Sequence, residues 1–185
     1  MKNKTSQIML IVGIIIVIIA VFVYSQKKPA GVSKSGEVKV GIILGFTGPI
    51  ESLTPAMAAS AELAFTEVSD SGSFLGGAKI TALRADSTCV DSAAATTAAE
   101  GLISQDIAAI MGADCSGVTG AIAKNVAVPN GVVMISPSAT SPGLTTLDDK
   151  GLFFRTAPSD ARGGQILADI TKDRGITSVA ITYTN

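Results

Sequence analysis

Short apolar runs alternate along this chain with longer stretches in which apolar residues recur at helical spacing. Apolar runs that end in turn residues are typical of buried strands, and apolar residues three or four positions apart are typical of a helix with one buried face. The runs predict strands over 37–46, 79–85, 107–111, 132–135, 152–156 and 177–183. Because strands that alternate with helices indicate βαβ units, the pattern predicts an α/β fold with a doubly wound, mainly parallel sheet.

The predicted helices lie between these strands, and several have clear start signals. Thr54 is expected to cap the first helix, with Pro55 at its first position, where the missing N–H of proline costs nothing. Asp91 is expected to cap the second helix, and Ser159 or Asp160 the last. The residues expected to face inward are Met57, Ala61, Ala64 and Val68 in the first helix and Ile166, Leu167 and Ile170 in the last.

The N-terminal residues form a different kind of segment. Lysines flank an uncharged apolar run from Ile8 to Tyr24, which is typical of export or anchoring. The run is longer than most signal-peptide cores but shorter than the about 20 residues of a spanning helix. Residues 1–25 are therefore expected to be either a signal peptide or an N-terminal membrane anchor, and residues 26–36 a linker. Both alternatives place the rest of the chain in the periplasm or at the cell surface.

Composition narrows the possible functions. The 185 residues include no histidine, which excludes from this chain a Ser-His-Asp or Cys-His nucleophile and a histidine-ligated metal site. The formal net charge is −1, and no basic stretch occurs outside the N-terminal segment, so a nucleic-acid partner is not expected. A GxxxxGK[ST] or GxGxxG phosphate motif is also missing. The sequence therefore predicts no metal, cofactor or catalytic site in this chain. We also expect a monomer.

Hydroxyl side chains follow the first four predicted strands, at their carboxyl ends. In a parallel sheet these ends share one edge, and ligands bind there. The hydroxyl residues are Thr47, Ser52, Thr54, Ser87, Thr88, Ser116, Ser136, Ser138 and Thr140. Ser116 is expected to open the third helix, whose free N–H groups favour an anion, so Ser116 and Thr140 could together bind a carboxylate. The alternatives are hydroxyls that only satisfy local turns and, for Ser116, a plain helix cap.

Cys89 and Cys115 both lie in these loops, after the second and third predicted strands. In an exported protein, a pair of cysteines at one edge of a sheet suggests a disulfide. Such a bond would close a loop of about 26 residues and contribute about 3 kcal/mol to stability. The alternative is two buried free thiols.

Several segments, taken in order, carry a family resemblance. They are VKVGIILGFTGPI, SAELAFTEV, FLGGAKI, ADSTC, GADCSG, VVMISPSATSPGLT, FFRTAPSDARGG and SVAITYTN. From about Val38 onward the chain resembles the substrate-binding proteins of ABC importers, specifically the branched-chain amino acid (Leu/Ile/Val) type. The resemblance implies the type I periplasmic-binding fold, in which two lobes joined by crossing strands close on a ligand. It implies lobe one over 37–155 and the beginning of lobe two over 156–185, so that the chain is an N-terminal fragment.

The same resemblance implies roles for particular residues. Ser116 stands where the family holds the ligand carboxylate, and Ser138 stands where a backbone carbonyl accepts the ligand ammonium. Thr140 matches a threonine that helps bind both charged groups. Leu53 replaces an aromatic residue that often covers the ligand, which leaves the side-chain preference open. The remaining candidates for ligand binding are Thr47 and Ala139.

The predicted function follows from this resemblance. It is the extracytoplasmic binding of a small zwitterionic ligand, an amino acid of the branched-chain type or a relative, for delivery to the permease subunits of an ABC importer. The resemblance also implies that Cys89 pairs with Cys115, as in some members of the family. The alternative with the same fold is a membrane-anchored sensor ectodomain. A third possibility, an extracytoplasmic α/β enzyme, requires catalytic residues supplied by lobe two.

Overall fold

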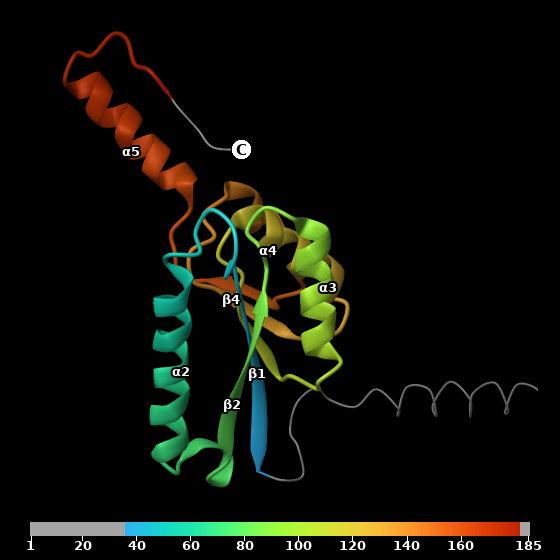
Figure 1. The fold of residues 1–185 in the computed structure, drawn as a ribbon. Coiled ribbons are helices and arrows are strands. Elements are labelled where there is room, and N and C mark those ends of the chain that lie inside the picture. Colours follow the sequence, from blue (N-terminus) through green and yellow to red (C-terminus); the bar gives the residue numbers. More distant parts are fainter. Residues whose placement is uncertain (1–35, 182–185) are drawn as a thin grey trace, which may run out of the picture. The chain divides into compact units, whose positions relative to one another are not determined.

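Parallel strands form one five-stranded sheet in the computed structural model of the chain, which describes residues 36–181 (Figure 1). The strands are β1 Glu37–Leu44, β2 Lys79–Asp86, β3 Ala109–Gly112, β4 Val133–Ser136 and β5 Phe153–Arg155. They lie in the order β2-β1-β3-β4-β5, and every neighbouring pair is parallel. The predicted α/β fold with a doubly wound parallel sheet is confirmed.

Helices cover both faces of the sheet. The helices are α2 Thr54–Asp70, α3 Ser92–Ile103, α4 Ser116–Ile122 and α5 Asp160–Asp173, and a π-helical stretch over Ala123–Ala127 continues α4. Successive strand residues point to opposite faces. Accordingly, Ile42 packs in the core under α2, whereas Ile43 packs in the core under α3 and α4.

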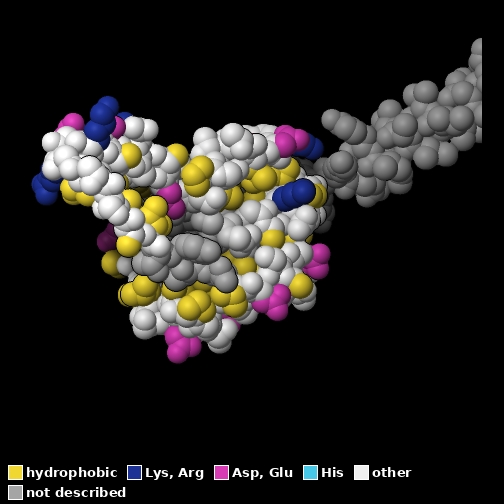
Figure 2. Space-filling model, turned by 90° about the horizontal axis from the view of Figure 1, so that it is seen from above, with side chains coloured by type: hydrophobic (Ala, Val, Ile, Leu, Met, Phe, Trp, Pro, Cys, Tyr) yellow, Lys and Arg dark blue, Asp and Glu magenta, His cyan; other side chains and the backbone are white. Residues whose placement is uncertain are grey.

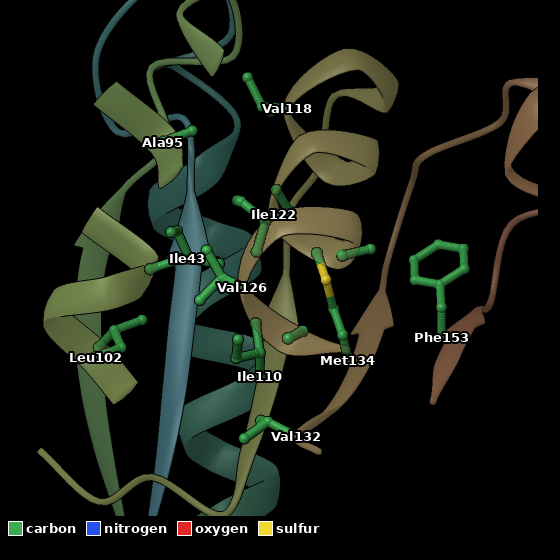
Figure 3. Packing of buried hydrophobic residues seen from close by; sticks show 14 of the residues in the cluster. Ile43, Ala95, Leu102, Ile110, Val118, Ile122, Val126, Val132, Met134 and Phe153 are labelled. Atoms are coloured by element: carbon green, nitrogen blue, oxygen red, sulfur yellow. The ribbon is translucent and has the colours of Figure 1, made fainter. Parts of the chain in front are cut away.

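The larger core lies between the sheet and the α3–α4 layer (Figure 3). Ile43 and Ile110 rise from neighbouring strands and meet Leu102 of α3 and Ile122 of α4, and all four are almost completely buried. Fully burying each such side chain contributes about 1.5–3 kcal/mol. This core therefore holds the strands in place. It thereby also positions the carboxyl edge of the sheet, from which the loops after each strand emerge.

The predicted start of α2 is wrong in one respect. Thr54 is the first residue of the helix, and the capping position belongs to Leu53, which makes no side-chain capping bond. The Thr54 hydroxyl instead donates to the carbonyl of Gly45, 3.0 Å away. The hydroxyl is buried and holds the helix to the loop after β1, a long-range role that capping signals in the sequence do not predict.

The predicted inward face of α2 is also partly wrong. Ala64 is exposed and Val68 is 41% exposed, while the helix buries Ala58 and Ser69 instead. The Ser69 hydroxyl donates to Phe65 O at 2.6 Å and accepts the Ile80 N–H at 2.9 Å. Because this polar side chain joins the helix to β2, the buried face is rotated away from the stripe that apolar residues alone predict.

The C-terminal elements differ from prediction more strongly. The predicted Ser159 cap of α5 is confirmed, since its hydroxyl accepts the Ala161 N–H. However, α5 has no buried residues, and its apolar side chains, predicted to face inward, are exposed: Ile166 by 42%, Leu167 by 67% and Ile170 by 43%. The strand predicted over 177–183 is not formed in residues 177–181, and the remainder lies outside the described residues. A strand needs a neighbour for its backbone groups, and no described strand pairs with this segment.

The predicted export or anchoring segment precedes the residues that the structure describes. The predicted signal peptide or anchor over 1–25 lies outside the described residues, as does the linker over 26–36 apart from Gly36. Within residues 36–181, no helix has the length and apolar character needed to cross a membrane.

Candidate functional site

The loops that follow β1, β2, β3 and β4 meet at Asp114, a residue that is only 4% exposed. Its Oδ2 accepts the Gly45 N–H at 2.8 Å, and its Oδ1 accepts the Ser87 hydroxyl at 3.4 Å and the Cys115 N–H at 2.9 Å. The Asp114 carbonyl accepts the Ser138 hydroxyl at 3.0 Å. One residue therefore joins four loops at the carboxyl edge of the sheet.

A glycine makes the approach to Asp114 possible. Gly112 ends β3 with φ +127°, and a Cβ at this position would overlap the carbonyl of Ile43 in β1. Only glycine combines this conformation with such a close approach between two strands. The chain can therefore turn directly from β3 into Asp114.

Ser116 and Thr140 lie together at the carboxyl edge of the sheet. The Ser116 Oγ accepts the N–H of Thr140 at 3.2 Å and the N–H of Ser141 at 3.1 Å. A hydroxyl has two acceptor positions and one proton, so both acceptor positions are used. Within residues 36–181 no group accepts its proton, so the Ser116 hydroxyl can still donate a hydrogen bond.

The helix-cap alternative for Ser116 does not describe this arrangement. The capping position of α4 is Cys115, which makes no side-chain capping bond, and Ser116 is the first helical residue. The Ser116 hydroxyl holds the loop after β4, which lies 24 residues further along the chain. The residue therefore links two loops of the candidate site.

Ser138, Ala139 and Thr140 use their backbone and side chains differently. The Ser138 hydroxyl is bonded to Asp114, and its carbonyl accepts no hydrogen bond from the described residues. The Ala139 side chain is completely buried in the core, and its N–H donates to the Ser136 hydroxyl at 3.0 Å. The Thr140 hydroxyl donates to Asp160 Oδ2 at 2.8 Å. This loop therefore offers one free carbonyl and one hydroxyl that already binds a carboxylate.

Thr47 lies at the same edge but is engaged with Asp86. Its hydroxyl donates to Asp86 Oδ2 at 2.6 Å, and the Thr88 N–H donates to Asp86 Oδ1 at 2.8 Å. Burial raises the pKa of Asp86 and is the largest single effect. The hydrogen bonds from Thr47, Thr88 and the Phe46 N–H together outweigh it and hold that pKa below its ordinary value. Asp86 therefore ties the loop after β1 to the loop after β2.

Leu53 lies just before α2, and its side chain is 61% exposed. The next residue, Thr54, is bonded to Gly45, whose N–H in turn reaches Asp114. Leu53 is thus connected to the other candidates through the backbone of the β1 loop, and its apolar side chain is left free to contact other groups.

The predicted disulfide is confirmed. Cys89 and Cys115 are joined with an S–S distance of 2.03 Å across a separation of 26 residues, so the alternative of two free thiols is wrong. Cys115 immediately precedes Ser116, and a Cβ on Gly45 would lie 3.2 Å from the Cys89 Cβ. The bond therefore packs against the β1 loop and anchors the residue before the candidate carboxylate donor.

Sequence reasoning missed Asp114 and Arg155. The Arg155 Nη1 donates to the carbonyl of Ser141 at 2.8 Å and to that of Ala139 at 3.4 Å, and its Nη2 donates to the Thr145 hydroxyl at 2.6 Å. Arg155 thus also holds the loop after β4. The available signals were a single acid between a buried strand and a helix start, and a single arginine in the apolar run LFFRT.

The surface at this end of the sheet carries few cations. Figure 2 views the molecule from the end at which these loops lie, and the Lys and Arg side chains visible there lie toward its left and right. Within the described part of the chain, no group of three or more His, Cys, Asp or Glu residues could hold a metal ion. Among the charged groups at these loops, Asp86, Asp114, Asp160 and Arg155 each already take part in hydrogen bonds with the loops.

Comparison with known proteins identifies the family. Residues 56–185 match the family model described as the receptor family ligand binding region. The chain belongs to this family. Among curated relatives, it is 27% identical over 150 residues to Leu/Ile/Val-binding protein homolog 3 of Brucella melitensis, covering 80% of this chain. It is 29% identical over 143 residues to the leucine-, isoleucine-, valine-, threonine- and alanine-binding protein of Pseudomonas aeruginosa, covering 75% of this chain.

Solved structures of this family have the same fold. The branched-chain amino acid transporter substrate-binding protein LivJ of Streptococcus pneumoniae, solved with isoleucine, superposes with a TM-score of 0.66 at 28% identity over 75% of this chain. The resemblance to Leu/Ile/Val-binding proteins and the type I periplasmic-binding fold are thereby confirmed. The chain spans only 38% of that structure, and 39% and 37% of the two curated relatives.

Proposed function

We propose that this chain contributes the first lobe of an extracytoplasmic substrate-binding protein. The protein binds a small zwitterionic amino acid of the branched-chain type and delivers it to the permease subunits of an ABC importer. The observation that carries the proposal is the state of Ser116, whose acceptor positions are filled by the loop after β4 while its proton remains available. The names of the relatives support the same ligand class.

The proposed binding mode assigns one group to each charge of the ligand. Ser116 donates its hydroxyl proton to the ligand carboxylate, and Thr140 supplies a second donor. The Ser138 carbonyl accepts the ligand ammonium. Hydrogen bonds to charged groups contribute roughly 1.5–3 kcal/mol each, so three give about 4.5–9 kcal/mol, which corresponds to roughly millimolar to micromolar affinity.

The remaining candidates set the surroundings of the ligand. Leu53, with its exposed apolar side chain, is proposed to contact the ligand side chain. Thr47 and Ala139 belong to the site as parts of the loops after β1 and β4. Because an aliphatic residue at position 53 gives a smaller contact than an aromatic ring, the preferred ligand side chain is expected to differ from that of relatives with an aromatic residue there.

Location and domain organisation follow the same proposal. Disulfides form and persist in oxidising compartments, so the Cys89–Cys115 bond supports a position outside the cytoplasm. Lobe one is proposed to extend over 37–155 and lobe two to begin within 156–185, after an N-terminal export or anchoring segment. The proposed role is binding and delivery, which the names of the relatives as binding proteins support.

The test is calorimetric titration of the protein that carries both lobes with L-leucine, L-isoleucine and L-valine. Ser116→Ala removes the proposed donor and is expected to weaken binding by at least about tenfold, equivalent to about 1.4 kcal/mol, without loss of the fold. Ser60→Ala is the matched control, because Ser60 is exposed on α2 and bonds only to Ala56 O within its own helix. Unchanged affinity in Ser116→Ala would reject the proposed role of this hydroxyl.

A further inference from the structure

Thr140 and Asp160 are joined by two hydrogen bonds. The hydroxyl donates to Asp160 Oδ2 at 2.8 Å, and the Asp160 N–H donates to the Thr140 carbonyl at 3.0 Å. The two residues are 20 positions apart and connect the loop after β4 to the first turn of α5. An anionic side chain of the protein therefore occupies one of the donors that the proposed ligand carboxylate needs.

A threonine hydroxyl has a single proton. It makes one strong, linear bond to a carboxylate, so Asp160 and a ligand carboxylate cannot both receive it at full strength. Within residues 36–181 no basic side chain forms a salt bridge with Asp160, which leaves its charge able to repel a second carboxylate nearby.

We propose that Asp160 is an internal competitor for the ligand carboxylate, which lowers the affinity of the site by holding the Thr140 hydroxyl. Ligand binding then exchanges one carboxylate for another at this hydroxyl. The inference rests on the proposed function and adds to it a residue that sets affinity. The backbone bond from the Asp160 N–H to the Thr140 carbonyl is unaffected by the exchange, so α5 stays attached to the loop.

The start of α5 does not need the Asp160 side chain as a cap. Ser159 occupies the capping position, and its hydroxyl accepts the Ala161 N–H at 3.3 Å. An acidic residue in the first turn interacts favourably with the helix dipole, but an uncharged residue there costs only a fraction of a helix's stability. The bond to Thr140 is therefore the specific interaction of this carboxylate, and replacing Asp160 should leave the helix in place.

The test compares Asp160→Asn with the unsubstituted protein carrying both lobes, by calorimetric titration with L-leucine and with L-leucinamide, which lacks a carboxylate. The variant keeps the size and one acceptor but removes the charge, so L-leucine should bind about fivefold more tightly, as expected when a charge-assisted competing bond becomes a neutral one. L-Leucinamide should show no gain. Asp173→Asn, an exposed position at the end of α5, is the control for net charge and should change neither ligand.

A second variant separates competition from a general effect of charge. In a Thr140→Val background the contested proton is absent, so most of the gain from Asp160→Asn should disappear. A full gain in that background, or unchanged or weaker L-leucine binding by Asp160→Asn alone, would overturn the inference while the Ser116 result still stands for the proposed function. If the unsubstituted protein binds none of the branched-chain amino acids, both the proposed function and this inference are overturned.

Discussion

The carboxylate of Asp114 accepts the backbone N–H of Gly45 across 2.8 Å, although the two residues lie 69 positions apart. A carboxylate buried this deeply is tolerated only when hydrogen bonds replace its hydration. Gly45, Ser87 and Cys115 supply those bonds from three different loops. The burial of this carboxylate therefore requires the loops at the candidate site to come together. Asp114 thus contributes both to the stability of the fold and to the arrangement of the site.

Replacement of Asp114 should test this coupling. Asp114→Ala leaves the buried N–H of Gly45 and the partly buried N–H of Cys115 without an acceptor, each at a cost of about 1–3 kcal/mol, so the free energy of unfolding should fall by about 3 kcal/mol. Asp114→Asn keeps one acceptor and should cost less. Urea denaturation measures both. Asp106→Asn, at an exposed turn, is the control, and a similar loss there would contradict a specific role for Asp114.

The sequence predicted what depends on local pattern. Apolar runs located β1 to β5, and the position of two cysteines after neighbouring strands suggested the Cys89–Cys115 bond that the structure contains. The meeting of Ser116 with the Thr140 loop followed from parallel strands alone, because their carboxyl ends share one edge.

Hydrogen bonds between residues far apart in the sequence could not be predicted in this way. Asp114, Arg155 and the Thr140–Asp160 pair each depend on which polar group faces which across the fold, and periodicity carries no such information. The inward face of α2 was misplaced for the same reason, since the buried hydroxyl of Ser69 contributes to it. The apolar residues of α5 correctly predicted a helix. Their spacing alone does not show whether another part of the protein buries them.

Removal of the disulfide should lower stability by about 3 kcal/mol, because the bond closes a loop of about 26 residues in the unfolded chain. The double variant Cys89→Ser, Cys115→Ser tests this in urea denaturation. The unsubstituted protein should lose the same amount on reduction with dithiothreitol, and the double variant should not respond to the reductant. A reductant-sensitive double variant would show that the loss has another origin.

Arg155→Lys should loosen the loop after β4. The guanidinium binds two backbone carbonyls and the Thr145 hydroxyl at once, and a lysine ammonium cannot reproduce this planar fork. We expect faster hydrogen exchange at the N–H groups of Thr140 and Ser141 and a loss of about 1 kcal/mol in stability. Arg162→Lys, on exposed α5, is the matched control. Equal exchange rates in both variants would argue against a role for Arg155 in ordering this loop.

The Thr47–Asp86 interaction should make stability depend on acid pH in a defined direction. The pKa of Asp86 in the folded protein lies below its ordinary value of 3.8, so its charged form is favoured by folding. Its contribution is therefore fully present above that ordinary value and is lost as the pH falls through the lower folded pKa.

Asp86→Asn removes this titration. The stability difference between the unsubstituted protein and the variant should be constant near neutral pH and should shrink below about pH 4, where the unfolded chain begins to bind the proton. Urea denaturation across pH 3 to 7 measures this difference. Asp91→Asn is the comparison variant, because it removes a carboxylate that caps α3 and has other hydrogen-bond partners. A difference that stays constant to the lowest pH would mean that the Thr47, Thr88 and Phe46 hydrogen bonds do not favour the charged form, and that this pair of loops is held together by other contacts.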